Sequence, residues 1–460
     1  RLLAGREDLA EERVAMLLPA GPDYVTTLLA IWRAGGVAVP LAKAAAAGEL
    51  EYALGTARAS RLVTSGEFVE KIGPTAAALG IEIVAPGQRG SPRDLPGVAP
   101  ERRAMMLFTS GTTSRPKGVV STHANIAAQI ESLVEAWRWT AADSIPLFLP
   151  LHHIHGIVNV LCCALWCSAK VDLIDGFDAK TVFARVAERR YTLFMAVPTI
   201  YVKMISALDA MPEAERERIT AGFADLRLMV SGSAACPVSV HEQWRALTGA
   251  TLLERYGMTE IGMALSNPYT GDRRPGTVGQ PLPGVEVILV GEDGARIEAE
   301  ETPGEIRVRG ATVFAEYWDN PEATASEFAD GWFCTGDIAD VVDGYYRILG
   351  RASVDIIKSG GEKVSALEIE SALLDHDNVA EVAVVGLADE TWGEAVHAAV
   401  VPKPGAAPGA DDLRAWLKTR LSNYKVPKAI HFVDALPRNA MGKVTKQAVK
   451  ALLEEQIRNH

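Results

Sequence analysis

The sequence of 460 residues predicts an α/β protein that ends in a small α+β domain. As far as about residue 265, short apolar runs alternate with amphipathic stretches, which is the pattern of alternating strands and helices. After Gly279, short β-type runs alternate with Gly and Asp turns, which predicts a more β-rich subdomain. Beyond Gly350, helical and strand patterns follow one another as in a compact α+β domain.

The individual elements follow from these patterns in chain order. In the first part we expect strands at 14–18, 37–41 and 62–63 and a loop at 86–100. We expect one helix that is capped by Asp23 and closed by Gly35-Gly36, and another at 49–57. In the β-rich part we expect strands at 285–290, 305–309 and 345–349. In the last part we expect helices at 366–374, 411–421 and 446–456 and strands at 381–385 and 395–401. The predicted division is an N-terminal domain of residues 1–350, a hinge at 351–353 and a C-terminal domain of residues 354–460.

Composition excludes several classes of protein. Hydrophobic residues make up 48% and charged residues 23%, as in an ordinary globular protein rather than a disordered chain. The net charge of −12 argues against electrostatic binding of nucleic acid. The five cysteines contain no Cys-x-x-Cys pair, so a zinc or redox site has no support. The most apolar stretch, residues 157–167, is shorter than the roughly 20 residues that span a bilayer, so we expect no membrane span.

Several common catalytic motifs are absent from the sequence. No two glycines are separated by a single residue, which excludes a G-x-G-x-x-G dinucleotide fingerprint. The Gly442-Lys443 pair is followed by Val444 and therefore forms no Walker A loop. Neither H-E-x-x-H nor G-x-S-x-G occurs. Dehydrogenases, P-loop NTPases, zincins and α/β-hydrolases thus lose their best sequence support.

One segment has the composition of a phosphate-binding loop. An apolar run from Met106 leads into Thr109-Ser-Gly-Thr-Thr-Ser-Arg-Pro-Lys-Gly118, with hydroxyls, glycines and two cations. Glycines let backbone N–H groups approach an anion, and hydroxyls with Lys or Arg complete the cradle. The sequence therefore indicates a polyphosphate ligand, while a polar surface loop is the structural alternative.

This segment resembles the phosphate loop of the acyl-adenylate-forming superfamily, which contains acyl-CoA synthetases, nonribosomal adenylation domains and luciferases. Four further motifs of that superfamily follow in order, and they are Tyr256-Gly-Met-Thr-Glu260, Trp332-Phe-Cys-Thr-Gly-Asp337, Gly350-Arg351 with Asp355-Ile-Ile-Lys-Ser-Gly-Gly361, and Pro437-Arg-Asn-Ala-Met-Gly-Lys443. The resemblance covers essentially the whole chain. It implies the adenylate-forming enzyme fold, with a large N-terminal domain and a small mobile C-terminal domain. The family's first segment is expected before Arg1, and Ser114 stands where the family usually has Gly.

The resemblance also assigns the ATP site. Glu260 would hold Mg²⁺, Thr259 would contact the α-phosphate, Tyr256 would stack on adenine, and Asp337 would accept from the ribose hydroxyls. Lys443 would bridge the attacking carboxylate and the α-phosphate, so Lys443, Thr259 and Glu260 are the expected catalytic residues. The other expected ATP and AMP contacts are Thr109, Ser110, Gly111, Thr112, Thr113, Lys117, Ser233, Ala234, Glu254, Gly257, Met258 and Arg351.

The implied chemistry has two steps. A carboxylate is a poor acylating agent, so it first attacks the α-phosphate of ATP and releases pyrophosphate, and a thiol then displaces AMP. The resemblance implies that the C-terminal domain rotates about a hinge near Ser353 between the two steps. Gly360 and Gly361 would then let the thiol arm of CoA approach, and Lys363 is a candidate for its phosphates.

The acid is indicated by a closer resemblance to malonyl-CoA and methylmalonyl-CoA synthetases. The similar stretches are Pro150-Leu-His-His-Ile-His-Gly156, Val230-Ser-Gly-Ser-Ala-Ala235 and residues 253–279. A dicarboxylate brings a second negative charge that a buried pocket must pair with a cation. We expect Arg274 to supply it, unless Arg274 is an ordinary basic residue of the family. His155 and Ser231 are expected at the acyl substrate, with a histidine packed at a helix start as the alternative for His155.

The sequence thus predicts a ligase that joins a short dicarboxylate, malonate or methylmalonate, to CoA with ATP and Mg²⁺. The alternatives are a CoA ligase for a monocarboxylic acid, a non-catalytic nucleotide-binding protein, and an adenylation enzyme that loads a carrier protein. Small molecules are the expected partners, and both a monomer and a dimer remain open. We expect a cytoplasmic protein, or one that has lost an organelle-targeting segment.

Overall fold

The structure is a computed structural model of the chain, and it describes residues 2, 6–87, 94–109, 116–360, 362–389, 391–438 and 444–458. The chain divides into two compact units. The first contains Arg1–Cys236, Val240–Val287 and Val308–Phe333, and the second contains Pro237–Ser239, Ile288–Arg307 and Cys334–His460. This division places residues 334–350 with the C-terminal residues, whereas the sequence assigns them to the N-terminal domain. The hinge at 351–353 stays a prediction.

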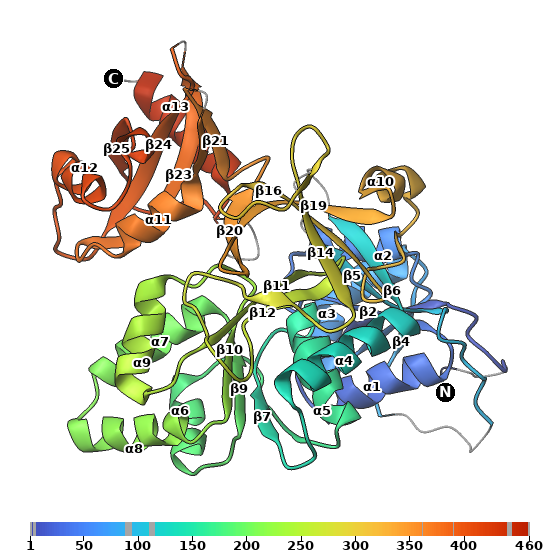
Figure 1. Cartoon of the computed structure of the whole chain (residues 1–460). Helices are drawn as coiled ribbons and strands as arrows, with labels where there is room; N and C mark the ends of the chain where they lie inside the picture. The colour runs from blue at the N-terminus through green and yellow to red at the C-terminus, as the bar shows by residue number, and fades with distance from the viewer. Residues whose placement is uncertain are drawn as a thin grey trace. The chain divides into compact units, whose positions relative to one another are not determined.

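A mixed seven-stranded sheet forms one layer of the first unit (Figure 1). Its strands, in spatial order, are β17 (Glu316–Tyr317), β6 (Lys117–Thr122), β5 (Arg103–Thr109), β2 (Val37–Pro40), β1 (Arg13–Leu17), β3 (Arg61–Thr64) and β4 (Glu82–Val84). The strands from β5 to β4 pair in parallel, and β6 and β17 pair antiparallel. Val14–Leu17 of β1 are buried throughout, as in a parallel strand covered on both faces.

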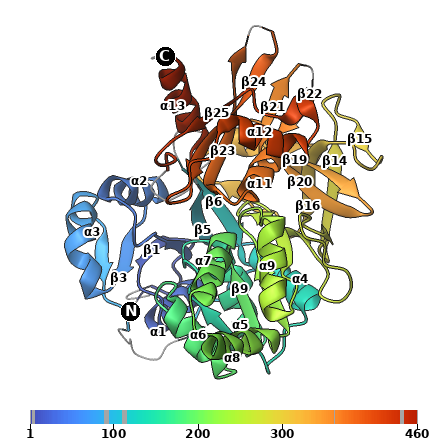
Figure 2. The ribbon, with the colours of Figure 1, turned by 90° about the vertical axis from the view of Figure 1, so that its left-hand side faces the viewer.

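The helices around this sheet are α1 (Pro22–Arg33), α2 (Ala47–Ala57), α3 (Gly66–Ala78) and α4 (His123–Trp137). Leu50, Leu54 and Ile72 of α2 and α3 pack with strand residues in one core cluster, and the two helices lie together in Figure 2. Helix α1 begins at Pro22, before the expected cap Asp23, because proline fits the first helical position. Asp23 lies in its first turn, where an acid stabilises the positive end of the helix dipole.

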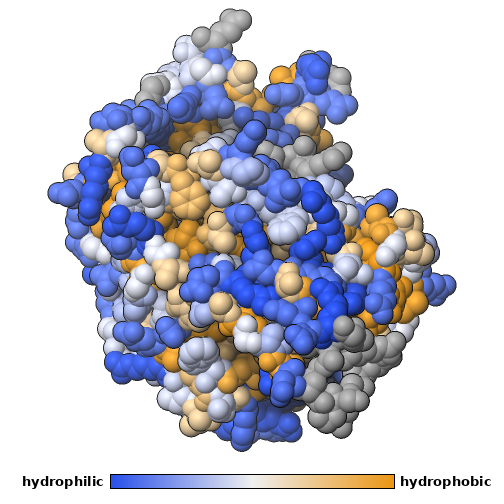
Figure 3. Space-filling model, turned by 90° about the vertical axis from the view of Figure 1, so that its right-hand side faces the viewer, coloured by the Kyte–Doolittle hydropathy of each residue, from blue (hydrophilic) through white to orange (hydrophobic). Residues whose placement is uncertain are grey.

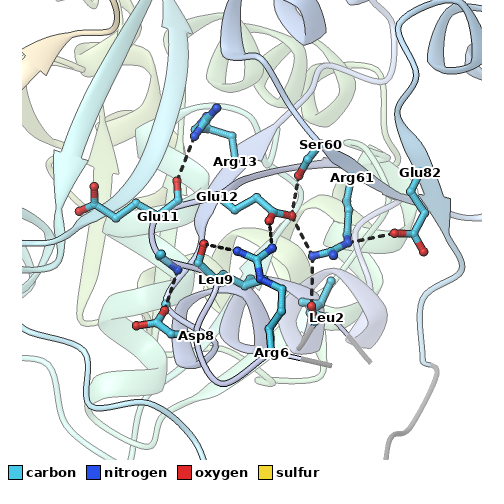
Figure 4. Close-up of polar contacts among 12 residues, drawn as sticks. Leu2, Arg6, Asp8, Leu9, Glu11, Glu12, Arg13, Ser60, Arg61 and Glu82 are labelled. Carbon is cyan, nitrogen blue, oxygen red and sulfur yellow. Dashed lines mark hydrogen bonds and ion pairs between the residues drawn. The ribbon is translucent and has the colours of Figure 1, made fainter. Parts of the chain in front are cut away.

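A polar cluster ties the start of the first unit to this sheet (Figure 4). The Glu12 carboxylate accepts from Arg6, Ser60 and Arg61. Arg61 also donates to the backbone oxygen of Leu2 at 3.1 Å and to Glu82 at 3.0 Å. These contacts connect β1, β3 and β4 at their N-terminal ends.

A five-stranded sheet carries the second half of the first unit. Its order is β13 (Gln280–Pro281), β12 (Gly262–Ser266), β11 (Leu253–Met258), β10 (Leu228–Ser231) and β9 (Leu193–Ala196). The neighbouring helices are α6 (Ala179–Ala187), α7 (Pro198–Asp209), α8 (Glu213–Ala224) and α9 (Val238–Thr248). Strands β7 (Ser144–Leu147) and β8 (Lys170–Leu173) form a separate pair. Between them in the chain lie the π-helix η1 (His155–Cys162) and α5 (Cys163–Trp166). Helix α10 (Pro321–Ser326) follows farther along the chain.

A third sheet accounts for the β-rich texture after Gly279. Its order is β15 (Arg296–Ile297), β14 (Val285–Val290), β16 (Gly304–Gly310), β19 (Trp332–Val342) and β18 (Phe328–Ala329), with β20 (Tyr345–Arg351) paired to β19. The strands expected at 285–290, 305–309 and 345–349 are all present.

The last sheet belongs to the second unit. Its order is β22 (Glu362–Ser365), β21 (Ile356–Ser359), β24 (Gly393–Pro402) and β23 (Val379–Asp389), with β25 (Ala429–Phe432) paired to β24. Helices α11 (Ala366–Leu374), α12 (Ala410–Lys418), η2 (Asn423–Lys425) and α13 (Lys446–Arg458) surround it. Strand β23 is longer than the expected 381–385, because its antiparallel pairing with β24 continues to Asp389 through residues of low β-propensity.

On the face drawn in Figure 3, hydrophilic side chains interrupt the apolar ones over most of the surface. No helix in the described part of the chain combines the length and the apolar character that crossing a membrane requires.

Candidate active site

The two ends of the phosphate-loop segment lie on the paired strands β5 and β6. Thr109 ends β5 and Lys117 begins β6, and the two are cross-strand partners. Ser110, Gly111, Thr112 and Thr113 lie outside the described residues, as does Ser114. Lys117 Nζ lies 3.2 Å from Glu327 Oε1 and 4.4 Å from the ring centroid of Tyr317. The hairpin therefore presents a cation whose position is fixed by two neighbours.

The turn between β11 and β12 carries the second motif. Tyr256, Gly257 and Met258 end β11, and Thr259 and Glu260 form the turn into β12. Glu260 is only 5% exposed, and its Oε1 accepts from the hydroxyl of Tyr317 at 3.1 Å. The sequence carried no signal for Tyr317, because its two-residue strand β17 is defined by pairing with β6.

Glu254 lies inside the protein rather than on its surface. Its carboxylate accepts from the backbone N–H of Cys236 at 2.9 Å and lies 3.1 Å from Nε2 of His241. These contacts connect β11 to the end of the segment 231–236, which holds Ser231, Ser233 and Ala234. Glu254 therefore holds that segment in place, and its expected contact with the nucleotide stays a prediction.

Arg255 is a buried cation that the sequence did not single out. It is 3% exposed, and burial lowers the pKa of its guanidinium to about 10. Within the described residues its Nε lacks a hydrogen-bond partner and no acidic side chain forms an ion pair with it. A Cβ on Gly232 would lie 2.6 Å from Arg255 Cζ, so only glycine leaves room for the guanidinium there.

Ser233 and, through it, His155 are connected to this guanidinium. Arg255 Nη2 donates to Ser233 Oγ at 3.3 Å, and Ser233 Oγ lies 3.3 Å from His155 Nδ1. Ser233 has a φ of +73°, which is a strained conformation for a residue other than glycine. Burial and the charge of Arg255 hold the pKa of His155 well below its usual value, so the ring is neutral.

The remaining polar groups here are also buried. Nε2 of His155 and Oγ of Ser231 have no hydrogen-bond partner among the residues that the structure describes. His155 opens the π-helix η1, a helix type that often marks functional sites. His155, Ser231 and Arg255 are thus all buried, and the acyl-binding role of His155 and Ser231 stays a prediction.

Arg274 has a different environment from the one expected. Its Nε pairs with Asp272 Oδ2 at 2.8 Å, and about a third of its side chain is exposed. The adjacent Arg273 donates to the backbone oxygens of Pro268, Thr251 and Tyr269, which makes it a structural residue rather than a solvated one. Arg274 therefore already has a carboxylate partner, whereas no acidic side chain forms an ion pair with Arg255 within the described residues.

In the second unit, Asp337 and Arg351 form a pair. They are cross-strand partners on β19 and β20, and Arg351 Nε lies 3.1 Å from Asp337 Oδ1. Ser353 follows in an exposed turn, where the backbone N–H of Ala352 donates to Gly336. The two predicted nucleotide contacts of this unit therefore lie together.

The expected CoA contacts lie on the β21–β22 hairpin. Gly360 has a φ of +61°, and a Cβ there would lie 2.6 Å from the ring of Trp392. Lys363 pairs with Glu292 at 3.1 Å, as does Lys358 at 3.5 Å. Gly361 and Lys443 lie outside the described residues. The roles of all these residues stay predictions.

Comparison with known proteins gives a consistent result. The model of the AMP-binding enzyme family matches residues 5–318, and that of the AMP-binding enzyme C-terminal domain matches residues 368–443. The chain is 45% identical to a mitochondrial malonate–CoA ligase of Mus musculus over 474 residues, which covers 96% of this chain and 81% of that protein. It is 44% identical to the human malonate–CoA ligase over 96% of this chain and 83% of that protein.

Comparison with solved structures also finds CoA ligases. The ATP-bound crystal structure of MatB from Rhodopseudomonas palustris matches with a TM-score of 0.88 and 35% identity, over 98% of this chain and 90% of that one. A malonyl-CoA ligase in a ternary product complex with methylmalonyl-CoA and AMP matches with a TM-score of 0.68 and 38% identity, over 93% of this chain and 91% of that one.

Proposed function

Since the chain belongs to the AMP-binding enzyme family and is an AMP-forming acyl-CoA synthetase, we propose that its acid substrate is malonate or methylmalonate. The products would be the acyl-CoA thioester, AMP and pyrophosphate. The observation that carries this proposal is the buried guanidinium of Arg255. Its Nε has no hydrogen-bond partner and it forms no ion pair within the described residues, where Glu254 acts on it only through its charge.

A buried cation without a counter-charge is costly, because burial removes its hydration. A dicarboxylate supplies the missing ion-pair partner: one carboxylate reacts at the α-phosphate while the other pairs with Arg255. A guanidinium suits this role because its planar N–H groups match a carboxylate. We therefore propose Arg255, in place of Arg274, as the residue that binds the distal carboxylate.

The hydrogen bonds around Ser233 indicate what His155 contributes. Ser233 Oγ accepts from Arg255 Nη2, so its own proton is available for Nδ1 of His155. A neutral ring that accepts at Nδ1 carries its proton at Nε2, and Nε2 has no partner within the described residues. We propose that Nε2 donates to a carboxylate oxygen of the acid.

The residues present also fit a magnesium nucleotide. Mg²⁺ is usually bound through one or two carboxylates together with substrate phosphates and water. The described residues hold no cluster of three or more metal-ligating side chains, whereas Glu260 offers one buried carboxylate. Glu260 would hold the ion, whose charge would offset the negative charge that develops on the phosphates. Lys117 and, by resemblance, Lys443 would bind the phosphates, and Asp337 would bind the ribose.

The cytoplasmic location stays a prediction, although the relatives from Mus musculus and Homo sapiens are named as mitochondrial.

The test is CoA-dependent formation of AMP with ATP and Mg²⁺ across acetate, octanoate, benzoate, succinate, malonate and methylmalonate. We expect turnover with malonate and methylmalonate only, because their second carboxylate reaches Arg255. Faster turnover with octanoate or benzoate would establish a monocarboxylate ligase instead. AMP and pyrophosphate released without any dependence on CoA would point to a carrier protein as the acceptor.

A further inference from the structure

A line of contacts joins the phosphate-loop lysine to the expected metal ligand through one tyrosine. The hydroxyl of Tyr317 donates to Glu260 Oε1 at 3.1 Å, and Lys117 Nζ lies 4.4 Å from the centroid of the same ring. We infer that Tyr317 is a positioning residue that orients the Glu260 carboxylate for the magnesium nucleotide and places Lys117 beside it. This inference rests on the proposed binding of ATP and Mg²⁺.

Tyr317 is itself held firmly by the fold. It is 4% exposed and pairs with Val119 across the β17–β6 ladder. Its backbone N–H donates to Thr324 Oγ1 at 2.9 Å, and the ring of Phe314 packs edge-on with centroids 4.8 Å apart. Phe314 N–H in turn donates to the backbone oxygen of Glu260 at 2.7 Å. The tyrosine hydroxyl and the Glu260 backbone are therefore fixed relative to one another.

A carboxylate on a turn has several rotamers, and only some present an oxygen to a bound ion. The hydroxyl of Tyr317 selects among them, because the buried Glu260 loses a hydrogen bond in any other rotamer. Groups that orient a metal ligand in this way typically change metal affinity or activity roughly 10- to 100-fold when they are removed.

The ring of Tyr317 has a second role toward Lys117. An ammonium above an aromatic face is attracted by the ring. The same ammonium also pairs with Glu327, whose Oε1 lies 3.2 Å from Lys117 Nζ. Tyr317→Phe removes the hydroxyl and keeps the ring, so it separates the two roles.

The test measures the affinity for α,β-methylene-ATP, an analogue that cannot be adenylated, by isothermal titration calorimetry in saturating Mg²⁺ and in EDTA. The readout is the factor by which Mg²⁺ tightens binding. We expect Tyr317→Phe to lower this factor about 10-fold and to leave the Kd in EDTA within about twofold of wild type. Tyr24→Phe is the matched control, because the Tyr24 hydroxyl is also buried and donates to the backbone oxygen of Leu151 at 2.6 Å. It should leave the factor unchanged.

An unchanged factor in Tyr317→Phe would overturn the inference, and so would an equal loss of affinity in Mg²⁺ and in EDTA, which indicates general damage to the site. If the wild-type protein binds the analogue no more tightly with Mg²⁺ than without it, the proposed nucleotide chemistry itself fails. That outcome is distinguishable, because it is seen before any variant is measured.

Discussion

Arg255 Nη2 donates to Ser233 Oγ across 3.3 Å, and this bond joins a buried cation to a residue with a left-handed backbone. The bond places the guanidinium beside the segment 231–236, which Glu254 and Cys236 fasten to β11. The selectivity proposed for the acid therefore depends on a few contacts at the ends of two neighbouring strands, β10 and β11.

Replacing the buried arginine tests the dicarboxylate site directly. We expect Arg255→Met to lower kcat/KM for malonate about 100-fold or more, since an unpaired buried charge costs roughly 3–5 kcal/mol. Arg274→Met is the matched control, and it should change kcat/KM less than about fivefold, because its pair with Asp272 is partly exposed. Steady-state kinetics of the two variants with malonate shows which arginine binds the distal carboxylate. A larger loss of kcat/KM in Arg274→Met than in Arg255→Met would identify Arg274 as the residue that binds the distal carboxylate.

Two variants of Ser233 separate the strain of its backbone from the binding role of its hydroxyl. Ser233→Gly should be about 1 kcal/mol more stable than Ser233→Ala, because glycine adopts a φ of +73° without strain. Both variants should raise KM for malonate about 10-fold, since each removes a hydroxyl bonded to a charged group. Thermal unfolding and KM measurements check the two parts. Equal stabilities of the two variants would show that the backbone strain is relieved in solution.

Neutral histidines predict a loss of stability in acid. Burial lowers the pKa of His152 to about 4, and burial together with His431 and Lys428, opposed by Asp389, lowers the pKa of His397 to about 4. The unfolded chain, with an ordinary histidine pKa near 6.5, binds protons that the folded chain does not. The contribution of these two histidines to the free energy of unfolding should therefore be constant above about pH 7 and should fall as the pH drops from about 6.5 toward 4.

Denaturant unfolding at several pH values measures this slope. His397→Gln should flatten it, because the variant has one fewer group to protonate on unfolding. A variant as steep as wild type would locate the acid sensitivity in other groups.

The pair of Asp337 and Arg351 predicts a nucleotide-specific defect. Asp337→Asn should raise KM for ATP roughly 10- to 100-fold, because a charged acceptor of ribose hydroxyls is lost. KM for malonate should stay within about twofold. Initial rates with each substrate varied in turn separate the two constants, and a parallel rise in both would indicate a structural role for the ion pair.

The local patterns of the sequence were sufficient for most elements. The helix expected at 366–374 coincides with α11, because its apolar spacing and the serine before it, whose Oγ accepts from Glu368 N–H, are both local features. The fold class and the membership in the acyl-CoA synthetases were also predicted, because five motifs occur in order.

The site was predicted less completely. Arg255 was missed because β11 is buried on both faces at Leu253, Glu254 and Arg255, so strand alternation gives no sign of which face a charge occupies. The signal that could have indicated Arg255 was the presence of two adjacent charged residues, Glu254 and Arg255, inside a buried strand. Tyr317 was missed for another reason: its partners lie 57 and 200 residues away in the chain, and only the tertiary fold brings them together.

The burial of the cysteines has a consequence for an enzyme whose co-substrate is a thiol and whose product is a thioester. Burial raises the pKa of Cys162 and of Cys236 to about 12, and it raises the pKa of Cys163 and Cys167 as well. At neutral pH these four sulfurs remain protonated and therefore poorly nucleophilic. CoA thus meets little competition from these four side chains for the activated acyl group, and burial protects them from acylation.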